Sequence, residues 1–344
     1  MAKAAVGQIC SSNSMAHNLE QCVRLVGQAA AAGAKILFLP EASDYIGASA
    51  QESLSLAKPI STSPFVSGLR SAAVRHQLAV HVGIHVPVSV KPVAAGSSSN
   101  PVLSSIPISN SNSTSTSEEK GEGEEGKEPQ RKLYNRTIYI HPNGHLDEAK
   151  SYDKLHLFDY PDAALRESNT TQAGAAFAAP FDSPVGRLGS LICFDLRFPE
   201  AALHLTTSSS PPSSSFVPSS SRSKPFPPAQ VLLYPSAFTV PTGRAHWEVL
   251  LRARAVETQS YVVAAAQVGR HNPGLSPRVS YGRSMVVDPW GRVLLALRGV
   301  RDDGEEAEDG AVGQLGVVDI DLAEWERVRK NMPLVRRTDV YPEV

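Results

Sequence analysis

Short apolar runs alternate with segments of helical periodicity along the first third of the chain. Apolar and small residues recur at helical spacing from Leu19 to Ala30, and Gly33 is placed to end that helix. The dipeptide Ser63-Pro64 is a start signal for a second helix that runs to about Gln77. The predicted strands of this part are residues 1–9, 35–39 and 78–86. The order strand, helix, strand, helix, strand predicts a layered α/β fold.

The second half of the chain repeats this pattern. Strands are predicted at residues 188–192, 231–235, 261–268, 283–295 (two strands around a turn) and 316–320. Helices are predicted at residues 195–205, 245–259 and 321–329. Between the halves, Leu133–Ile140 and Leu146–Tyr152 are predicted to pair around Asn143-Gly144, which is a hairpin signal. Each half supplies a sheet with helices on one face, and this predicts two sheets packed face to face in a four-layer αββα sandwich.

Two low-complexity stretches interrupt the pattern, at about residues 92–130 and 206–228. The first is rich in serine and then in glutamate and glycine, and the second is nearly all serine and proline. Such sequences bury too little apolar surface to offset the loss of chain entropy, so we expect disordered surface insertions. A regulatory, phosphorylated loop is the alternative. Because the pattern continues across both stretches, residues 1–344 are predicted to form a single domain.

Composition narrows the classes of partner and compartment. The 344 residues carry a formal net charge of −1, so no basic face predicts binding to nucleic acid. No apolar run approaches the ~20 residues that span a membrane, and the N-terminus has no signal or transit pattern. Cys10, Cys22 and Cys193 lack metal-ligand spacing. We therefore expect a cytoplasmic protein, with a mitochondrial location left open, and no metal or cofactor is implied.

Three strand-to-loop junctions carry candidate reactive groups: Glu41, Lys154 and Cys193. Cys193 alone is as well explained by core packing as by reactivity. However, a carboxylate near it can accept the thiol proton, and an ammonium can stabilise an oxyanion and lower the pKa of the thiol. The N-terminus of the following helix also favours a thiolate, and the Phe194 N–H is a second oxyanion donor. These groups suffice for acyl transfer by covalent catalysis.

Other interpretations of the same residues remain open. Glu41 is also explained as a solvated loop residue, and Lys154 as a surface charge. A papain-like pair, in which His156 or His246 serves as the base for Cys193, is compatible with the spacing.

Three sequence segments together resemble a known protein family. They are Phe38–Glu41, Tyr152–Asp159 and Leu191–Glu200. In content and order they resemble the catalytic blocks of the nitrilase superfamily of carbon–nitrogen hydrolases. The resemblance implies the αββα fold, with Glu41 as general base, Lys154 as oxyanion stabiliser and Cys193 as nucleophile. It also implies that Glu167 supports these three residues.

Within this superfamily the segments 166–170, 245–259 and 280–291 resemble the Nit branch. That resemblance implies hydrolysis of deaminated glutathione to 2-oxoglutarate and cysteinylglycine, or alternatively of 2-oxoglutaramate-type monoamides. Both substrates carry a carboxylate, for which Arg197 is the expected partner, although an ion pair with Glu200 also explains this arginine. Phe238 and Thr242 match pocket positions. A homodimer or larger assembly is implied, and a non-catalytic partner-binding scaffold is the alternative from another class.

Overall fold

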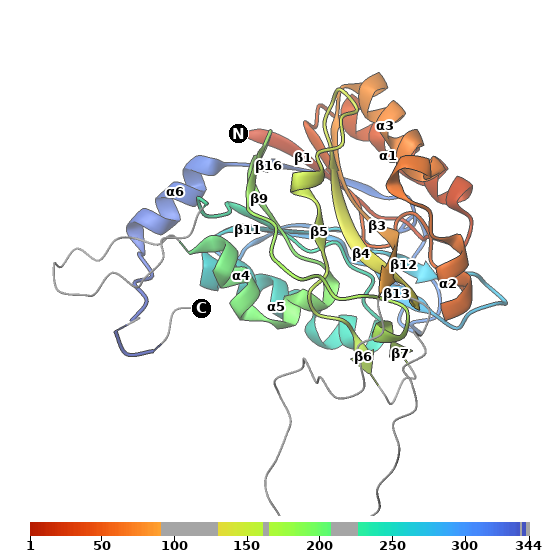
Figure 1. Ribbon diagram of the computed structural model, residues 1–344. Coiled ribbons are helices and arrows are strands. Elements are labelled where there is room, and N and C mark those ends of the chain that lie inside the picture. The colour runs from red at the N-terminus through yellow and green to blue at the C-terminus, as the bar shows by residue number, and fades with distance from the viewer. Residues whose placement is uncertain (91–129, 161–164, 208–225, 338, 342–344) are drawn as a thin grey trace, which may run out of the picture.

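The computed structural model describes residues 1–90, 130–160, 165–207, 226–337 and 339–341 (Figure 1). Two six-stranded sheets form the centre of the described structure. Helices lie on the outer faces of both sheets, α1 and α3 on one side and α4 and α5 on the other (Figure 1). The predicted four-layer αββα sandwich is therefore confirmed.

The first sheet combines strands from the N-terminal half with one strand from near the C-terminus. Its strand order is β16-β1-β2-β3-β4-β5, in which β1, β2 and β3 are parallel. The strands are β1 (Ala2–Gly7), β2 (Ile36–Phe38), β3 (Ala79–Val90), β4 (Gln130–Ile140), β5 (Tyr152–Asp153) and β16 (Leu315–Ile320). The helices α1 (Met15–Ala31) and α3 (Pro64–His76) pack their apolar faces on this sheet. The side chains of Ser14 and Ser63 cap their N-termini.

The second sheet has the same plan, with the strand order β15-β14-β11-β10-β9-β8 and with β9, β10 and β11 parallel. The strands are β8 (Phe181–Ser183), β9 (Gly186–Ser190), β10 (Val231–Leu233), β11 (Tyr261–Ala264), β14 (Met285–Val287) and β15 (Val293–Ala296). The helices α4 (Pro199–Thr206) and α5 (Val240–Thr258) cover its outer face.

Side-chain alternation along the strands separates the layers of the core. In β1, Ala5 packs toward α1 and α3, whereas its neighbours Ala4 and Val6 pack between the two sheets. Phe38 of β2 and Leu233 of β10 join this inter-sheet core. Leu188 of β9 belongs to the same core, so this core fixes the position of β9 relative to β2.

Several short elements complete the described fold. They are α2 (Ala50–Leu56), α6 (Leu322–Asn331), the pair β6 (Asp159–Tyr160) and β7 (Leu165–Arg166), the pair β12 (Val268–Arg270) and β13 (Val279–Tyr281), and 3-10 turns at Ile60–Thr62, Glu148–Lys150, Glu167–Asn169 and Cys193–Arg197. The strand predicted at residues 261–268 is thus divided between β11 and β12.

The predicted return strand at Leu146–Tyr152 is wrong in its middle, because Leu146 forms only an isolated antiparallel bridge with Ile140 and regular pairing is confined to Tyr152 in β5. The turn itself forms, because His141 N–H donates to His145 O at 2.8 Å and Gly144 has a φ of 78°. Asp147 then accepts a hydrogen bond from the Ala149 N–H and starts a 3-10 turn. Extended pairing resumes only at β5. A capping side chain within the segment therefore overrides its strand pattern.

The helix predicted at residues 195–205 is wrong at its start. Cys193–Arg197 is a 3-10 turn, Phe198 is extended, and α4 begins at Pro199. Proline disfavours helical geometry in the residue before it and suits the first position of a helix. The α-helix therefore begins one turn later than the apolar pattern indicates.

Most of the two low-complexity stretches, residues 91–129 and 208–225, lies outside the described residues. Val90 pairs with Gln130, so the chain leaves and re-enters the first sheet at one point. Thr206 is buried at the end of α4 and does not belong to the second insertion. The prediction of a single domain is favoured by the pairing of β16 with β1, and it stays a prediction. Among the described helices, none is long and apolar enough to cross a membrane.

Candidate active site

The three candidate side chains follow three strands: Glu41 follows β2, Lys154 follows β5 and Cys193 follows β9. The first two strands belong to one sheet and β9 to the other. All three side chains are buried, with exposed fractions of 5%, 2% and 9% for the whole residues. Face-to-face packing of the sheets therefore brings these strand ends together.

Lys154 is the cation at the centre of a buried ionic cluster. Its Nζ atom donates to Glu41 Oε1 at 3.1 Å and to Glu167 Oε2 at 2.8 Å. Asn135 Nδ2 bridges the same two carboxylates, at 2.6 Å from Glu41 Oε1 and 3.1 Å from Glu167 Oε1. The Phe158 N–H also donates to Glu167 Oε2 at 2.8 Å. One ammonium and one amide group thus hold both carboxylates in place.

The cluster is ionised despite its burial. Burial alone raises the pKa of Glu41, but the charge of Lys154 and the hydrogen bonds from Cys193 and Asn135 bring the pKa below its ordinary value. Burial likewise lowers the pKa of Lys154, and the charges of Glu167 and Glu41 bring that pKa well above its ordinary value. At neutral pH the site therefore holds an ammonium and a carboxylate capable of accepting a proton.

Cys193 faces this carboxylate from a tight turn. Its thiol donates a hydrogen bond to Glu41, and the Ala237 N–H donates to its sulfur. Its own N–H donates to Pro235 O at 3.0 Å. The residue has a φ of 46°, in the left-handed region that side chains other than glycine seldom adopt. Such strain persists only where neighbouring contacts over-determine the backbone.

The expected stabilisation of a thiolate at Cys193 is wrong in its net direction. The charge of Lys154 does lower the pKa of this thiol, as predicted. Burial and the negative charge of Glu41 raise that pKa by more, and the net pKa lies above the ordinary value. The helix that was expected to assist begins only at Pro199. The thiol is therefore a proton donor to Glu41 and not a preformed thiolate.

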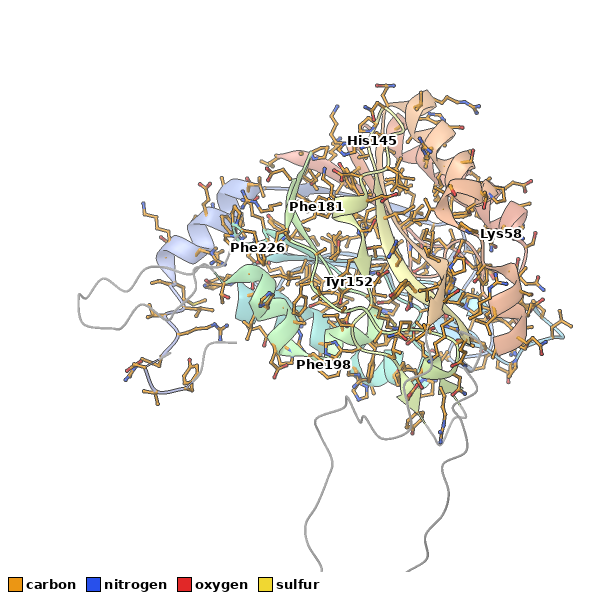
Figure 2. The ribbon with its side chains drawn as sticks, viewed as in Figure 1. Lys58, His145, Tyr152, Phe181, Phe198 and Phe226 are labelled. Carbon is orange, nitrogen blue, oxygen red and sulfur yellow. The ribbon has the colours of Figure 1, made fainter. Side chains whose placement is uncertain are left out.

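Asp195 joins the turn at Cys193 to the segment that carries Lys154. This buried carboxylate accepts hydrogen bonds from the Ile192 N–H at 2.9 Å and the Tyr152 hydroxyl at 2.8 Å. It also accepts from the His156 main-chain N–H at 3.1 Å. Tyr152, labelled in Figure 2, lies in the apolar cluster that also contains Cys193 and Leu196. Sequence reasoning missed this connection, because nothing in the local pattern distinguishes Asp195 from a helix-capping aspartate.

The two histidines that were alternative bases make other contacts. His156 Nδ1 lies 2.7 Å from Asp195 Oδ1, and His246 Nδ1 lies 2.9 Å from Arg197 Nη2. The acceptor of the thiol proton is the carboxylate of Glu41. The geometry therefore favours the Glu41 interpretation over a papain-like pair.

Arg197 lies four residues beyond the nucleophile candidate and is half-buried. Burial lowers the pKa of its guanidinium group. Within the described part of the chain, its buried Nε atom has no hydrogen-bond partner, and its Nη2 atom contacts His246. The contact with His246 takes the place of the alternative Glu200 ion pair, and a donor remains free to bind an acceptor such as a carboxylate.

The two remaining predicted pocket residues, Phe238 and Thr242, lie in different surroundings. Phe238 is buried in the apolar cluster that contains Cys193, with its ring 4.9 Å from that of Trp247. The hydrogen bonds that the structure gives to Thr242 both go to Thr239, at the start of α5. The structure thus brings Phe238 toward the nucleophile candidate but gives Thr242 local hydrogen bonds within the first turn of α5.

Asn135 is the site residue that sequence reasoning missed. It lies in β4, and its buried amide contacts both glutamates of the ionic cluster. The available signal was a residue type that is rare in strands, placed on the same face as Thr137 in an otherwise regular strand. Without the fold, nothing connects that signal to residues 41 and 167.

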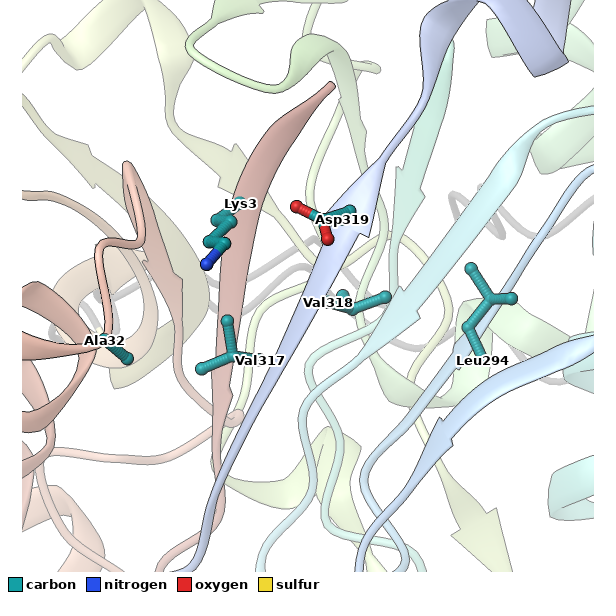
Figure 3. A pocket seen from close by; sticks show the side chains of 6 residues that line it. All are labelled: Lys3, Ala32, Leu294, Val317, Val318 and Asp319. Atoms are coloured by element: carbon teal, nitrogen blue, oxygen red, sulfur yellow. The ribbon is translucent and has the colours of Figure 1, made fainter.

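Two of the hollows in the described structure differ in their relation to the candidate site. One, of about 340 Å³, adjoins the Asp195 network and is lined by His156, Phe177, Phe198, Glu200, Ala201 and His204. The other, of about 560 Å³, lies beside β1 and β16 (Figure 3). Its lining residues are Lys3, Ala32, Leu294, Val317, Val318 and Asp319, and none of them belongs to the candidate site.

This chain belongs to the carbon–nitrogen hydrolase family, which it matches over residues 3–210 and 218–330. It is a hydrolase that acts on amides, and the predicted membership of the nitrilase superfamily is confirmed.

Relatives of known name cover nearly the whole chain. It is 37% identical to the probable hydrolase nit2 of Schizosaccharomyces pombe over 100% of both chains. It is 34% identical to the deaminated glutathione amidase of Mus musculus, over 98% of this chain and 84% of that protein. The crystal structure of the Caenorhabditis elegans NitFhit protein is 32% identical, with a TM-score of 0.70 over 99% of this chain and 67% of that chain.

Proposed function

We propose that this amidase hydrolyses deaminated glutathione to 2-oxoglutarate and cysteinylglycine through a thioester on Cys193. The observation that carries the mechanism is the buried cluster in which the Cys193 thiol donates to Glu41 and Lys154 donates to the same carboxylate. The choice of substrate is supported by the 34% identity to relatives named deaminated glutathione amidase.

The first half-reaction forms the thioester. Glu41 accepts the thiol proton as Cys193 Sγ attacks the amide carbon, which avoids the need for a free thiolate in this buried site. The carbonyl oxygen becomes an oxyanion beside the Lys154 ammonium and the main-chain N–H of Phe194, the residue after the nucleophile. The carbon–nitrogen bond then breaks, and Glu41 returns the proton to the leaving amine.

The second half-reaction consumes one water molecule. Glu41 removes a proton from the water, whose oxygen attacks the thioester carbon, and the same two donors stabilise the second oxyanion. The carbon–sulfur bond breaks, Cys193 recovers the proton from Glu41, and the acid product leaves. Glu167 and Asn135 support both steps, because their hydrogen bonds to Lys154 and Glu41 keep the two charged groups in position.

Arg197 is the proposed partner of the substrate carboxylate, because its buried Nε atom has no partner among the described residues. Phe238 and Thr242 stay predictions as pocket residues, and so do the cytoplasmic location and the homodimer or larger assembly. The 2-oxoglutaramate-type monoamides remain the second candidate substrates, since they carry a carboxylate as well.

Replacing Arg197 with methionine is expected to lower kcat/KM for deaminated glutathione about 10- to 100-fold, because one charge-assisted hydrogen bond is lost. Steady-state rates with deaminated glutathione and 2-oxoglutaramate, measured side by side, test both the residue and the substrate. The matched control is Arg75→Met on the exposed face of α3, which leaves both rates unchanged. A wild-type preference for 2-oxoglutaramate would instead assign the monoamide activity.

The acid limb of the pH profile should lie below the ordinary carboxyl value of 4.5, because Lys154 and Asn135 hold the pKa of Glu41 down. A base with a lowered pKa stays ionised as the pH falls, so we expect kcat/KM to reach half its neutral-pH value only below pH 4.5. Asn135→Leu removes a donor and shifts the acid limb upward.

The matched control for that variant is Thr137→Val, which alters the same face of β4 without touching Glu41. We expect it to keep the wild-type profile. An acid limb of the wild-type enzyme near neutral pH would identify a histidine as the base and would reject the role of Glu41.

A further inference from the structure

The residue after the proposed general base has an uncommon backbone conformation. Ala42 has a φ of 54°, in the left-handed region. On one side the turn rests on β3: Gly83 N–H donates to Pro40 O at 3.0 Å, and a Cβ atom at position 83 would lie only 2.6 Å from Glu41 Cα. The backbone of Glu41 is thus confined from the side of its own sheet.

The Gln267 side chain confines the same turn from the other half of the molecule. Gln267 is fully buried, and its Nε2 atom donates to Glu41 O at 2.9 Å and to Ala42 O at 3.3 Å. The same amide donates to Ser11 Oγ at 2.8 Å and accepts from the Ser11 N–H at 2.9 Å. Every polar atom of this amide is therefore engaged, and two of its contacts are the carbonyls on either side of Ala42.

The main chain of Gln267 supports the proposed nucleophile. Its N–H donates to Ser236 O at 2.9 Å. The residues on either side of Ser236 contact Cys193 directly: Pro235 O accepts from the Cys193 N–H, and the Ala237 N–H donates to the sulfur. One residue thus links the turn of the base to the loop that holds the thiol.

We propose that Gln267 is a positioning residue that sets the separation between the Glu41 carboxylate and the Cys193 thiol. This inference rests on the proposed roles of those two residues. Proton transfer and nucleophilic attack require a defined geometry, and a displacement of about 1 Å can reduce a rate about 100-fold. In the contacts described above, the Gln267 amide is the donor from the second half of the chain to the Glu41 and Ala42 carbonyls. Its removal would leave this turn without that support.

Gln8 offers a matched buried amide with no contact to Glu41. It is also fully buried, and it donates to Arg298 O at 2.8 Å and Ala311 O at 3.0 Å and accepts from the Ser284 N–H at 2.9 Å. Replacing either glutamine with methionine keeps the shape of the side chain and removes its hydrogen bonds. We therefore expect both variants to lose stability. Only the Gln267 variant is expected to lose reactivity at Cys193.

The test compares Gln267→Met with Gln8→Met in the full-length chain. The main readout is the rate at which iodoacetamide alkylates Cys193, followed by peptide mass spectrometry at neutral pH. We expect Gln267→Met to slow alkylation about 10- to 100-fold and to lower kcat by a similar factor with little change in KM. Gln8→Met should keep both rates within about twofold, at a similar drop in melting temperature. If Gln267→Met fails to fold, Gln267→Asn shortens the side chain while preserving its amide.

Equal alkylation rates in folded Gln267 and Gln8 variants would overturn the positioning role and leave the proposed function standing. Alkylation of wild-type Cys193 no faster than that of Cys10 would overturn both, because neither the nucleophile nor its base would then be activated.

Discussion

Replacing Cys193 with alanine is expected to lower kcat for amide hydrolysis by at least about 10⁴-fold, because no other group in the site can carry the acyl intermediate. The fold should survive, since a thiol is exchanged for a small apolar side chain in a position with apolar neighbours. The decisive measurement is rapid quenching followed by mass spectrometry. The wild-type enzyme should show the mass of an acyl adduct on the peptide containing residue 193, and the variant should show none.

Cys10→Ala is the matched control for this experiment. Cys10 is a half-buried thiol whose sulfur lies 3.3 Å from Arg270 O, and the pKa of this thiol is raised to about 12 by burial and by the charge of Glu306. It should keep the wild-type kcat. Turnover retained by Cys193→Ala, or a wild-type adduct on another residue, would reject the proposed thioester mechanism.

Replacing Lys154 with methionine should have the second large effect, on both activity and stability. Loss of one oxyanion donor lowers kcat by about 10²- to 10³-fold. Removing one partner of a buried ionic cluster also leaves Glu41 and Glu167 without their cation, which destabilises the fold by about 3–5 kcal/mol. Steady-state kinetics and urea unfolding measure the two effects separately.

The pH dependence of this destabilisation has a defined sign. In the wild-type protein the pKa of Lys154 is raised on folding, so its contribution is present at neutral pH and is lost only at strongly alkaline pH. In the variant the buried Glu41 carboxylate and the half-buried Glu167 carboxylate repel each other, and protonation relieves that repulsion. The variant should therefore lose more stability at pH values above neutral than in mild acid. A constant difference in unfolding free energy across this range would contradict the ionised cluster.

Lys150→Met is the control from the same segment of chain. Lys150 forms a half-buried ion pair with Asp147 at 3.3 Å, and its ammonium lies over the ring of Tyr139. Contacts of these kinds contribute on the order of 1 kcal/mol each. We expect wild-type kcat and a smaller loss of stability than in Lys154→Met. A comparable loss of activity in this variant would show that the segment, and not the ammonium of Lys154, matters for catalysis.

The protonated state expected for Cys193 changes how the chemistry is understood. Sequence reasoning pictured a thiolate stabilised by a lysine and a helix N-terminus. In the structure, burial and Glu41 outweigh Lys154, and the thiol remains a donor to the carboxylate. In the proposed mechanism Glu41 must then remove the proton during attack. That step makes the separation of the two side chains critical, and it is the reason that we expect a change at Gln267 to lower the rate.

Much of the architecture was predictable because its signals are local. Apolar runs, helical periodicity and start signals such as Ser63-Pro64 depend on neighbouring residues, and most predicted strands and helices appear in the fold. The failures have local causes of a different kind. Asp147 starts a turn inside a segment that was predicted to be the return strand of a hairpin, and Pro199 delays a helix. In both cases one side chain outweighs the periodicity around it.

The sequence by itself determined which residue types stand at the ends of the strands: Glu41, Lys154 and Cys193, in an order that resembles one superfamily. Only the tertiary structure decided which groups they meet. Asn135 and Gln267 reach Glu41 from positions 94 and 226 residues away, and Asp195 joins two loops. The physical reason is that these contacts depend on how two sheets pack across a shared core. The packing distance between the sheets cannot be inferred from any short stretch of sequence.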